Sequence, residues 1–568
     1  MTEGDALARV YAYHDRTKHH VNRFARSLGY LDWANQPNPF RTYEGAPRID
    51  LVEPLQALHG DGGSLNVAQG SSPVSSPLSA VGYDDLFADP ATEPRAGGLP
   101  AISALFRYSM GLSAWKEAGA SRWALRVNPS SGNLHPTEAY VLLGPGIASV
   151  EPGVFHYAPD AHALEQRCTF ARTAWAEVCD GLPPGACLVG LTSIHWREAW
   201  KYGERAFRYC QHDVGHALAA LRLAAALLGW QLRVWPGWSG ATLARVLGVD
   251  RAADVGDAER EDPACLCLAW PGNSAARCPV VSEALVDAVA NGEWHGRANE
   301  LSESRIEWEE IQKVAECTQA AASADPAPAR VAREPGAPPS RAVAAPSAAS
   351  VILRRRSAVD MDGRSAMDLD RFLFLLGRVM PGTAAPFDAP WWPPAIHLVL
   401  FVHRVTGLQP GIYVLPRTAD ALSRLQTACY ADFAWIAPES AVAARVPLCL
   451  LTPLDVRAAA RQLSCTQNIA ADGFFSLGML AEFDAGVASH GPAFYRALFW
   501  EAGMIGQVLY LEAEAVGARG TGIGCFFDDA VHEVLGLDDH QFQSLYHFTV
   551  GAAVDDPRLQ TRPGYPWE

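Results

Sequence analysis

Residues 205–229 read RAFRYCQHDVGHALAALRLAAALLG, and residues 496–517 read RALFWEAGMIGQVLYLEAEAVG. Aligned with one three-residue gap, the two segments place Gly215 opposite Gly506. Each predicts a long helix with small residues on one face. Because Gly and Ala let helices approach backbone to backbone, we expect these helices to pack two halves of the chain together.

The similarity continues on both sides of these helices. PGVFHY at 152–157 matches PGIYVL at 410–415, and each predicts a turn that leads into a strand. ARVLGVD at 244–250 matches HEVLGLD at 532–538, where a short helix ends. A shared order over about 200 residues indicates a diverged tandem duplication. Long helices interrupt clusters of strands, so we expect an α+β fold in which each half is an antiparallel-rich sheet flanked by helices.

Composition changes divide the chain into four parts. Residues 318–350 contain Ala, Pro, Ser and Arg with almost no large apolar residues, which is typical of a semi-rigid linker. Residues 60–100 are rich in Gly, Ser and Pro and predict a surface loop. We therefore expect a helical N-terminal extension with this loop over 1–100, a first domain over 101–317, the linker over 318–350 and a second domain over 351–568.

The bulk composition favours a globular protein with a small-molecule substrate. Of 568 residues, 49 % are hydrophobic and 19 % are charged. The net charge of −16 argues against general binding to nucleic acid or anionic membranes, since both depend on clustered Lys and Arg. The first twenty residues have no apolar core of a signal sequence, and most cysteines lie singly in apolar runs. We expect a cytoplasmic protein.

Three segments carry residues suited to ligand chemistry. RVNPSSGNLHPTEAYVLL at 126–143 predicts a tight loop with hydroxyl, amide and backbone N–H groups, which suit an oxygen-rich ring edge or a ribityl chain. LRRRSAV at 353–359 places guanidinium groups beside a hydroxyl, as a phosphate monoester requires. ARGTGIGCFFDD at 518–529 has glycines that allow close approach to a flat ligand. Taken separately, the first is also an ordinary turn and the second a solvated helix start.

Together these segments resemble the nitroreductase superfamily, and specifically its SagB/ThcOx-type dehydrogenase branch. The resemblance covers most of 101–272 and 351–568, and PSSGNLHPTEAY is its most specific match. It implies two nitroreductase-like domains that form an intramolecular pseudo-dimer, with FMN held between them. The implied FMN ligands of the first half are Arg126, Pro129, Ser130, Ser131 and Asn133. Those of the second half are Arg355, Arg356, Ser357, Gly522, Ile523 and Gly524.

The two halves have lost complementary parts of this ligand set. Opposite GTGIGC the first half has LRVWPG at 232–237, and opposite NPSSGNLHP the second half has MPGTAAPFDAPWWPP at 380–394. We therefore expect one FMN site per chain. A basic residue that family members often carry after the phosphate-binding serine is Val359 here, so we expect Arg558 to supply the second phosphate contact.

Lys201 and Tyr202 resemble the Lys-Tyr pair of the azoline-oxidising members of this family, and both side chain types can act as general bases. The alternative is that Tyr202 and Arg205 only cap and brace a helix. The resemblance implies an FMN-dependent oxidoreductase that transfers hydride between a nicotinamide or organic donor and a small-molecule or peptide acceptor. NAD(P)H is a candidate donor, and the chain is expected to be a monomer that binds neither nucleic acid nor membrane.

Two alternatives come from other classes. His212 and His216 lie one helical turn apart, close to the pattern of a zinc-dependent hydrolase. That pattern requires Glu where Asp213 stands, it has no evident third ligand, and the duplicate helix has Gly503 and Gln507 at these positions. The other alternative is a flavin-binding module without redox turnover.

Overall fold

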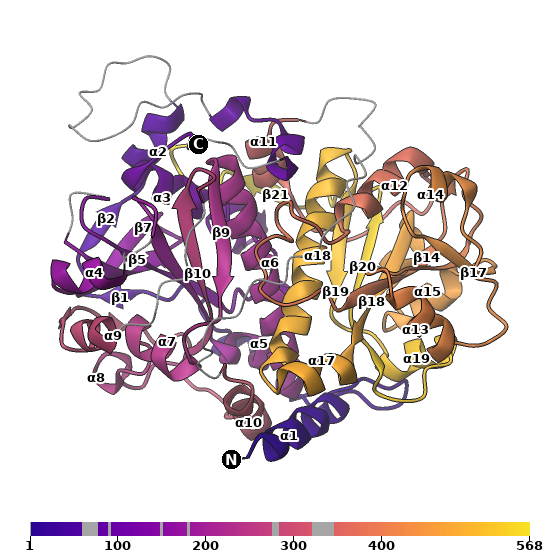
Figure 1. Ribbon diagram of the computed structural model, residues 1–568, viewed down its shortest axis with the longest axis horizontal. Helices are drawn as coiled ribbons and strands as arrows, with labels where there is room; N and C mark the ends of the chain where they lie inside the picture. The colour runs from indigo at the N-terminus through magenta and orange to yellow at the C-terminus, as the bar shows by residue number, and fades with distance from the viewer. Residues whose placement is uncertain are drawn as a thin grey trace.

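The computed structural model describes residues 2–59, 78–88, 93–147, 151–178, 182–274, 283–320 and 346–568. Two sheets lie on opposite sides of a central pair of helices, one sheet from each half of the chain (Figure 1). The pair consists of α6 (Ala206–Leu227) and α18 (Phe494–Ala515). The predicted α+β architecture is therefore confirmed.

The first sheet is antiparallel throughout, with the order β11-β7-β6-β5-β8-β10-β9 and β2 added beside β7. Its strands are β2 (Arg48–Asp50), β5 (Thr137–Leu143), β6 (Gly153–Ala158), β7 (Ala163–Thr169), β8 (Cys187–Ser193), β9 (Trp230–Trp235), β10 (Asp262–Pro271) and β11 (Glu293–Trp294). The helices of this half are α3 (Gly98–Arg107), α4 (Arg172–Val178), α5 (His195–Tyr202), α7 (Gly240–Leu247), α8 (Ala252–Val255), α9 (Glu283–Ala290) and α10 (Glu309–Cys317).

The second sheet is also antiparallel and has the order β17-β16-β14-β18-β20-β19. Its strands are β14 (Ile396–Val402), β16 (Gly411–Leu415), β17 (Cys449–Pro453), β18 (Phe475–Glu482), β19 (Arg519–Ile523) and β20 (Phe542–Gly551). Its helices are α11 (Ala348–Arg354), α12 (Leu369–Arg378), α13 (Ala421–Ala428), α14 (Glu439–Ala443), α15 (Arg457–Leu463), α16 (Ile469–Asp472), α17 (Phe483–His490) and α19 (Asp528–Leu535).

The two halves share one topology. The order β6-β5-β8-β10-β9 in the first sheet recurs as β16-β14-β18-β20-β19 in the second, and each long helix follows the third strand of its series in the chain. The matched VLG segments end α7 and α19 in the same way, with Gly248 and Gly536 in the left-handed region at φ +72° and +80°. The sequence similarity between the halves therefore corresponds to equivalent elements.

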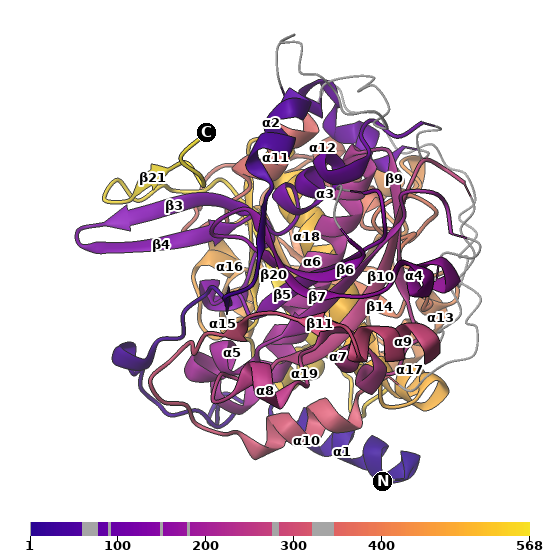
Figure 2. The ribbon, with the colours of Figure 1, turned by 90° about the vertical axis from the view of Figure 1, so that its left-hand side faces the viewer.

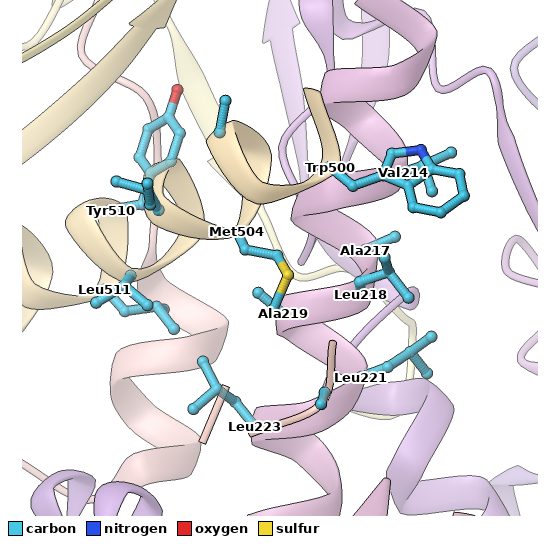
Figure 3. Close-up of a cluster of buried hydrophobic side chains, with 14 of the residues drawn as sticks. Val214, Ala217, Leu218, Ala219, Leu221, Leu223, Trp500, Met504, Tyr510 and Leu511 are labelled. Carbon is cyan, nitrogen blue, oxygen red and sulfur yellow. The ribbon is translucent and has the colours of Figure 1, made fainter. Parts of the chain in front are cut away.

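The central helices touch backbone to backbone. A Cβ on Gly215 would lie 2.2 Å from the Trp500 carbonyl oxygen, and one on Gly503 would lie 2.3 Å from the His212 carbonyl oxygen. Around this contact the helices bury an apolar cluster, in which Met504 of α18 reaches toward α6 (Figure 3). The predicted role of the small residues is confirmed, although Gly215 opposes Gly503 in space and not its sequence counterpart Gly506.

Both chain ends bind to the opposite half. The C-terminal strand β21 (Gln560–Arg562) joins the hairpin of β3 (Leu112–Ala118) and β4 (Ser121–Arg126), which projects from the body of the molecule (Figure 2). At the other end, the Tyr11 hydroxyl of α1 (Glu3–Arg16) donates to Asp484 at 2.7 Å. These exchanged contacts hold the halves together beyond the central helices.

A few short elements complete the fold. The extension contains α1, α2 (Val52–His59) and the short strand β1 (Tyr43–Glu44), which pairs with β12 (Arg297–Ala298). Strands β13 (Met367–Asp368) and β15 (Val405–Thr406) form a parallel pair.

Residues 60–77, 89–92 and 321–345, which include most of the predicted loop and linker, lie outside the described residues. Within the described part of the chain, no helix combines the length and the hydropathy that a membrane crossing needs.

Candidate active site

A cavity of about 1060 Å³ lies between the two halves. The first half contributes the β3–β4 hairpin, the loop before β5 and the first turns of α6. The second half contributes the chain after α11, one face of α18, strand β19 and residues 554–561. This volume is at the upper end of the range for cofactor and ligand sites. All predicted site residues except Lys201 and Arg558 line it.

The PSSGN loop forms one wall and is held in an uncommon backbone conformation. Gly132, Asn133 and His135 have φ values of +59°, +60° and +52°. Two side chains that were predicted to bind the cofactor also fix this loop. The Asn133 amide donates to the Ala124 carbonyl at 2.8 Å, and the Ser130 hydroxyl accepts the His135 N–H at 2.8 Å. These two hydrogen bonds hold the loop in this conformation.

Asp213 of α6 lies directly behind the loop, and sequence analysis missed its role. The Ser131 N–H and hydroxyl both donate to its carboxylate, at 3.1 and 3.2 Å. Burial raises the pKa of Asp213 to about 7, although the hydrogen bonds from the loop oppose the shift. A second buried carboxyl, Glu198 of α5, also has a raised pKa, because of burial and the nearby Asp213. Asp213 was visible in the sequence as the Asp of HDVGH, but its contact with the loop depends on the tertiary structure.

Another part of the cavity wall contains several cationic side chains. Arg355 is buried and donates to the Arg126 and Val127 carbonyls, while its Nη1 has no hydrogen-bond partner among the described residues. Burial and the neighbouring Arg355 lower the pKa of Arg356 to about 10. Lys116 of β3 was not predicted, and burial, Arg356 and Arg519 lower its pKa as well. Buried cations that lie close together suit an anion.

Two predicted arginines have other roles. The Arg558 side chain is 86 % exposed and pairs with Asp556 at 2.7 Å, so the expectation that it supplies the second phosphate contact is not met by this structure. Its neighbours Pro557 and Leu559 line the cavity, but its own side chain points elsewhere. Arg126 lines the cavity and is buried, and its guanidinium donates to the Thr137 and Pro39 carbonyls, so it holds the loop from behind.

The glycines of β19 accommodate tyrosines that line the cavity. A Cβ on Gly522 would lie 1.9 Å from the Tyr546 hydroxyl, and one on Gly524 would lie 2.0 Å from the Tyr209 ring. The Gly522 N–H donates to the Tyr510 hydroxyl at 2.8 Å, and the same hydroxyl lies 2.9 Å from that of Ser357. Glycine at positions 522 and 524 therefore leaves room for these tyrosine side chains in the cavity wall.

Lys201 and Tyr202 lie at the end of α5, against the PSSGN loop. A Cβ on Gly132 would lie 2.7 Å from the Tyr202 hydroxyl and 3.2 Å from the Lys201 Nζ. Lys201 is exposed, whereas Tyr202 lines the cavity. Burial, Glu198 and Tyr209 raise the pKa of Tyr202 well above its ordinary value. This environment favours the protonated hydroxyl, and the predicted role of Tyr202 in proton removal stays a prediction.

The histidines of the zinc alternative face an aromatic side chain. The His212 ring stacks on Tyr546 with centroids 4.2 Å apart, and His216 Nε2 lies 3.1 Å from the Tyr546 hydroxyl. No group of three or more His, Cys, Asp or Glu side chains suited to a metal ion occurs among the residues that the structure describes. The geometry provides no third ligand for this alternative.

Comparisons with known proteins agree with the fold. Residues 409–552 match the model of the Nitroreductase family. The chain is 37 % identical over 109 residues to the trifolitoxin-processing protein TfxB of Rhizobium leguminosarum bv. trifolii, a match that covers 18 % of this chain and 29 % of that protein. It is 30 % identical over 107 residues to MJ1384 of Methanocaldococcus jannaschii, whose name describes it as an inferred nitroreductase. This match covers 18 % of this chain and 52 % of that protein. The chain thus matches less than two thirds of either relative's length.

A solved structure extends the agreement to the whole chain. The crystal structure of an inferred nitroreductase from Anabaena variabilis superposes with a TM-score of 0.67 at 20 % identity, covering 96 % of this chain and 99 % of that one. Both halves and their arrangement are therefore part of a known fold. Residues 409–552 thus match the Nitroreductase family model, and the whole chain shares the fold of the Anabaena variabilis structure.

Proposed function

We propose that this protein is an FMN-dependent oxidoreductase of the SagB/ThcOx type with one FMN in the cavity between its halves. The observation that carries the proposal is the set of groups that line this cavity. Lys116 of the first half and Arg355 and Arg356 of the second half line it, together with the PSSGN loop and Tyr202. FMN needs both kinds of group, because it combines a dianionic phosphate with a redox-active ring.

The residues present fit the phosphate group. Arg355 has a buried Nη1 without a partner, and a phosphate oxygen would satisfy it with a charge-assisted hydrogen bond. Burial lowers the pKa values of Arg356 and Lys116, and neighbouring cations add to the effect, so a dianion beside them would favour both charged forms. The Ser357 hydroxyl, held by Tyr510, adds a neutral donor. The ring end would lie between the PSSGN loop and Gly522–Gly524.

FMN, when bound, supplies a two-electron acceptor or donor for hydride transfer. The chain supplies the proton chemistry around it. Tyr202 lines the cavity and is proposed to form a hydrogen bond with the substrate, and Lys201 beside it is proposed to assist proton removal together with this hydroxyl. Asp213 holds the loop that positions both groups against the cavity.

The proposed substrate is a small organic molecule or a short peptide. The printed name of TfxB connects that relative with the processing of trifolitoxin, and by analogy we propose a peptide-derived acceptor or donor for this chain. NAD(P)H is the candidate electron donor when the substrate is reduced. Redox turnover distinguishes this proposal from a flavin-binding module without activity.

The first test is the flavin content of purified protein. We expect yellow protein that releases about one FMN per chain on denaturation. Arg355→Ala should lower the affinity for added FMN, whereas Arg558→Ala, an exposed arginine outside the cavity, should leave it unchanged. Absence of binding after FMN is added to the wild-type protein contradicts the proposal. Failure of NADPH, or of any organic donor, to bleach bound FMN favours the inactive module.

A second test separates the halves. If both supply FMN ligands, neither residues 1–318 nor residues 350–568 should bind FMN tightly when expressed alone, and a mixture should recover binding. The covalent connection then acts by raising the effective concentration of one half near the other. Binding by one half as tight as that of the whole chain contradicts a site between the halves.

A further inference from the structure

Two cysteines meet at the edge of the cavity. The Sγ atoms of Cys465 and Cys525 lie 2.7 Å apart, although the residues are separated by sixty positions in the chain. Both are partly exposed, whereas the other eight cysteines in the described part of the chain are buried. Cys525 itself lines the cavity directly after Gly524. The pair is therefore close in space and accessible to small solutes.

We propose that Cys465 and Cys525 form a redox-active dithiol–disulfide pair in the cavity wall. A disulfide bond has an S–S distance of about 2.05 Å, so the sulfur atoms need to approach by less than about 1 Å. Such a small displacement falls within the rotation of two cysteine side chains. The proposal concerns these two residues alone and does not depend on bound FMN.

The surrounding backbone holds the two segments in register. The Gln467 side chain donates to the Ser464 carbonyl at 2.9 Å and to the Cys525 carbonyl at 3.1 Å, which connects the turn after α15 with the end of β19. The Phe527 N–H donates to the Leu463 carbonyl at 2.8 Å on the other side of the pair. Two independent hydrogen bonds between the segments thus flank the thiols and hold the two cysteines side by side.

The backbone at Cys465 is strained. Cys465 and Thr466 are consecutive non-glycine residues in the left-handed region, at φ +52° and +60°. Each such residue costs free energy and persists where the surrounding structure imposes it. This conformation presents the Cys465 sulfur to Cys525.

The two thiols are not equivalent. The hydrogen bond between them lowers the pKa of Cys525 and raises that of Cys465, and the guanidinium of Arg205 also favours the Cys525 thiolate. Arg205 comes from the first half and donates to the Gly524 carbonyl at 3.3 Å. Because the thiolate is the nucleophile, Cys525 is the attacking residue and Cys465 the resolving one.

The oxidant in this proposal is a low-molecular-weight disulfide. The Cys525 thiolate attacks one of its sulfur atoms, which forms a mixed disulfide and releases one small thiol. Cys465 then loses its proton and attacks Cys525 Sγ, which forms the protein disulfide and releases the second small thiol. Two protein thiols are oxidised and one small disulfide is reduced, with two electrons and two protons transferred. A dithiol reductant reverses the exchange.

The experiment uses the full-length protein as purified. It is reduced with dithiothreitol, freed of reductant, incubated with oxidised glutathione, alkylated and digested for mass spectrometry. We expect a linked Cys465–Cys525 peptide pair that disappears after renewed reduction. Cys449, which is buried on β17, provides the control, and Cys449→Ser should leave the linkage unchanged. Separate alkylation of Cys465 and Cys525 after oxidation overturns the proposal.

Single variants test the order of attack. Cys465→Ser should accumulate a stable mixed disulfide of glutathione on Cys525, because the resolving thiol is absent. Cys525→Ser should leave Cys465 with at least tenfold slower glutathione incorporation. Equal rates in the two variants overturn the assignment of Cys525 as the nucleophile. Circular dichroism of each variant checks that the fold is kept, and the linkage in the wild-type protein tests the pair without any substitution.

Discussion

Asp213→Asn removes a buried carboxyl that supports the PSSGN loop while keeping its shape. The amide oxygen of Asn can still accept the Ser131 N–H, which donates to the carboxylate at 3.1 Å. What the substitution removes is ionisation. We therefore expect the variant to differ from the wild-type protein mainly in how its stability depends on pH.

The magnitude follows from the two pKa values. An Asp carboxyl has an ordinary pKa of 3.8, and burial raises that of Asp213 to about 7 in the folded protein. The folded state thus holds the proton more tightly, so the contribution to stability is fully present below pH 3.8 and is lost as pH rises through 7. At about 1.4 kcal/mol per pKa unit, the whole effect is about 4 kcal/mol, of which about 3 kcal/mol falls between about pH 5 and pH 8.

The assay is urea unfolding of the wild-type protein and of the Asp213→Asn variant at several pH values between about 5 and 8. The free energy of unfolding of the wild-type protein should fall relative to that of Asp213→Asn by about 3 kcal/mol over this range. Parallel curves refute the reasoning, because they mean that Asp213 ionises alike in both states. Asp160→Asn, an exposed change, should run parallel to the wild-type protein. Asp528→Asn should also run parallel to the wild-type protein over this range, because Arg205 and Arg208 outweigh the effect of burial and lower the pKa of Asp528, so its contribution to stability is lost only below its ordinary pKa of 3.8.

Three further predictions concern other parts of the molecule. Gly503→Ala should lower the free energy of unfolding by about 1–3 kcal/mol, because the added Cβ overpacks the contact between the central helices. Gly377→Ala should not lower it, since no atom lies within 4 Å of that added Cβ. Equal denaturation midpoints for the two variants contradict the backbone contact. Lys201→Ala and Tyr202→Phe should slow hydride transfer from the true substrate by about 10²- to 10⁴-fold in stopped-flow measurements while FMN content stays constant, and unchanged rates reduce both residues to packing roles. Gly524→Ala should lower FMN affinity in a fluorescence titration, because the added Cβ would lie 2.0 Å from a tyrosine ring in the cavity wall; unaltered affinity shows that this wall can adjust.

Local sequence was sufficient where a pattern acts on its immediate neighbours. The PGVFHY and PGIYVL segments form β6 and β16, and the matched VLG segments end their helices with a left-handed glycine, because turns and helix ends depend on backbone preferences of a few adjacent residues. The α+β class followed in the same way. Every residue of β6 and β16 is buried, so neither strand has the alternation of buried and exposed residues that is typical of a half-exposed strand.

Residue chemistry also indicated which segments meet in one site, but not how each side chain is used. Arg355, Ser357 and the PSSGN loop do line one cavity, as the resemblance implied. Arg558 does not line the cavity, because its exposed side chain forms an ion pair with Asp556, two residues earlier in the chain. Lys116 carried no sequence pattern, since its place among the cationic side chains of the cavity wall depends on a hairpin that pairs with the C-terminal strand of the other half.

The sequence by itself determined the repeated order of helices and strands, the small residues that let α6 and α18 touch, and the segments that supply charge and hydroxyl groups. These properties depend on residue type and short-range spacing. Only the tertiary structure decided the raised pKa values of Asp213 and Tyr202 and the contact between Cys465 and Cys525. Each of these depends on burial and on a neighbour that is distant in the chain, and the free energy of an ionisable or nucleophilic group is set by what surrounds it in space.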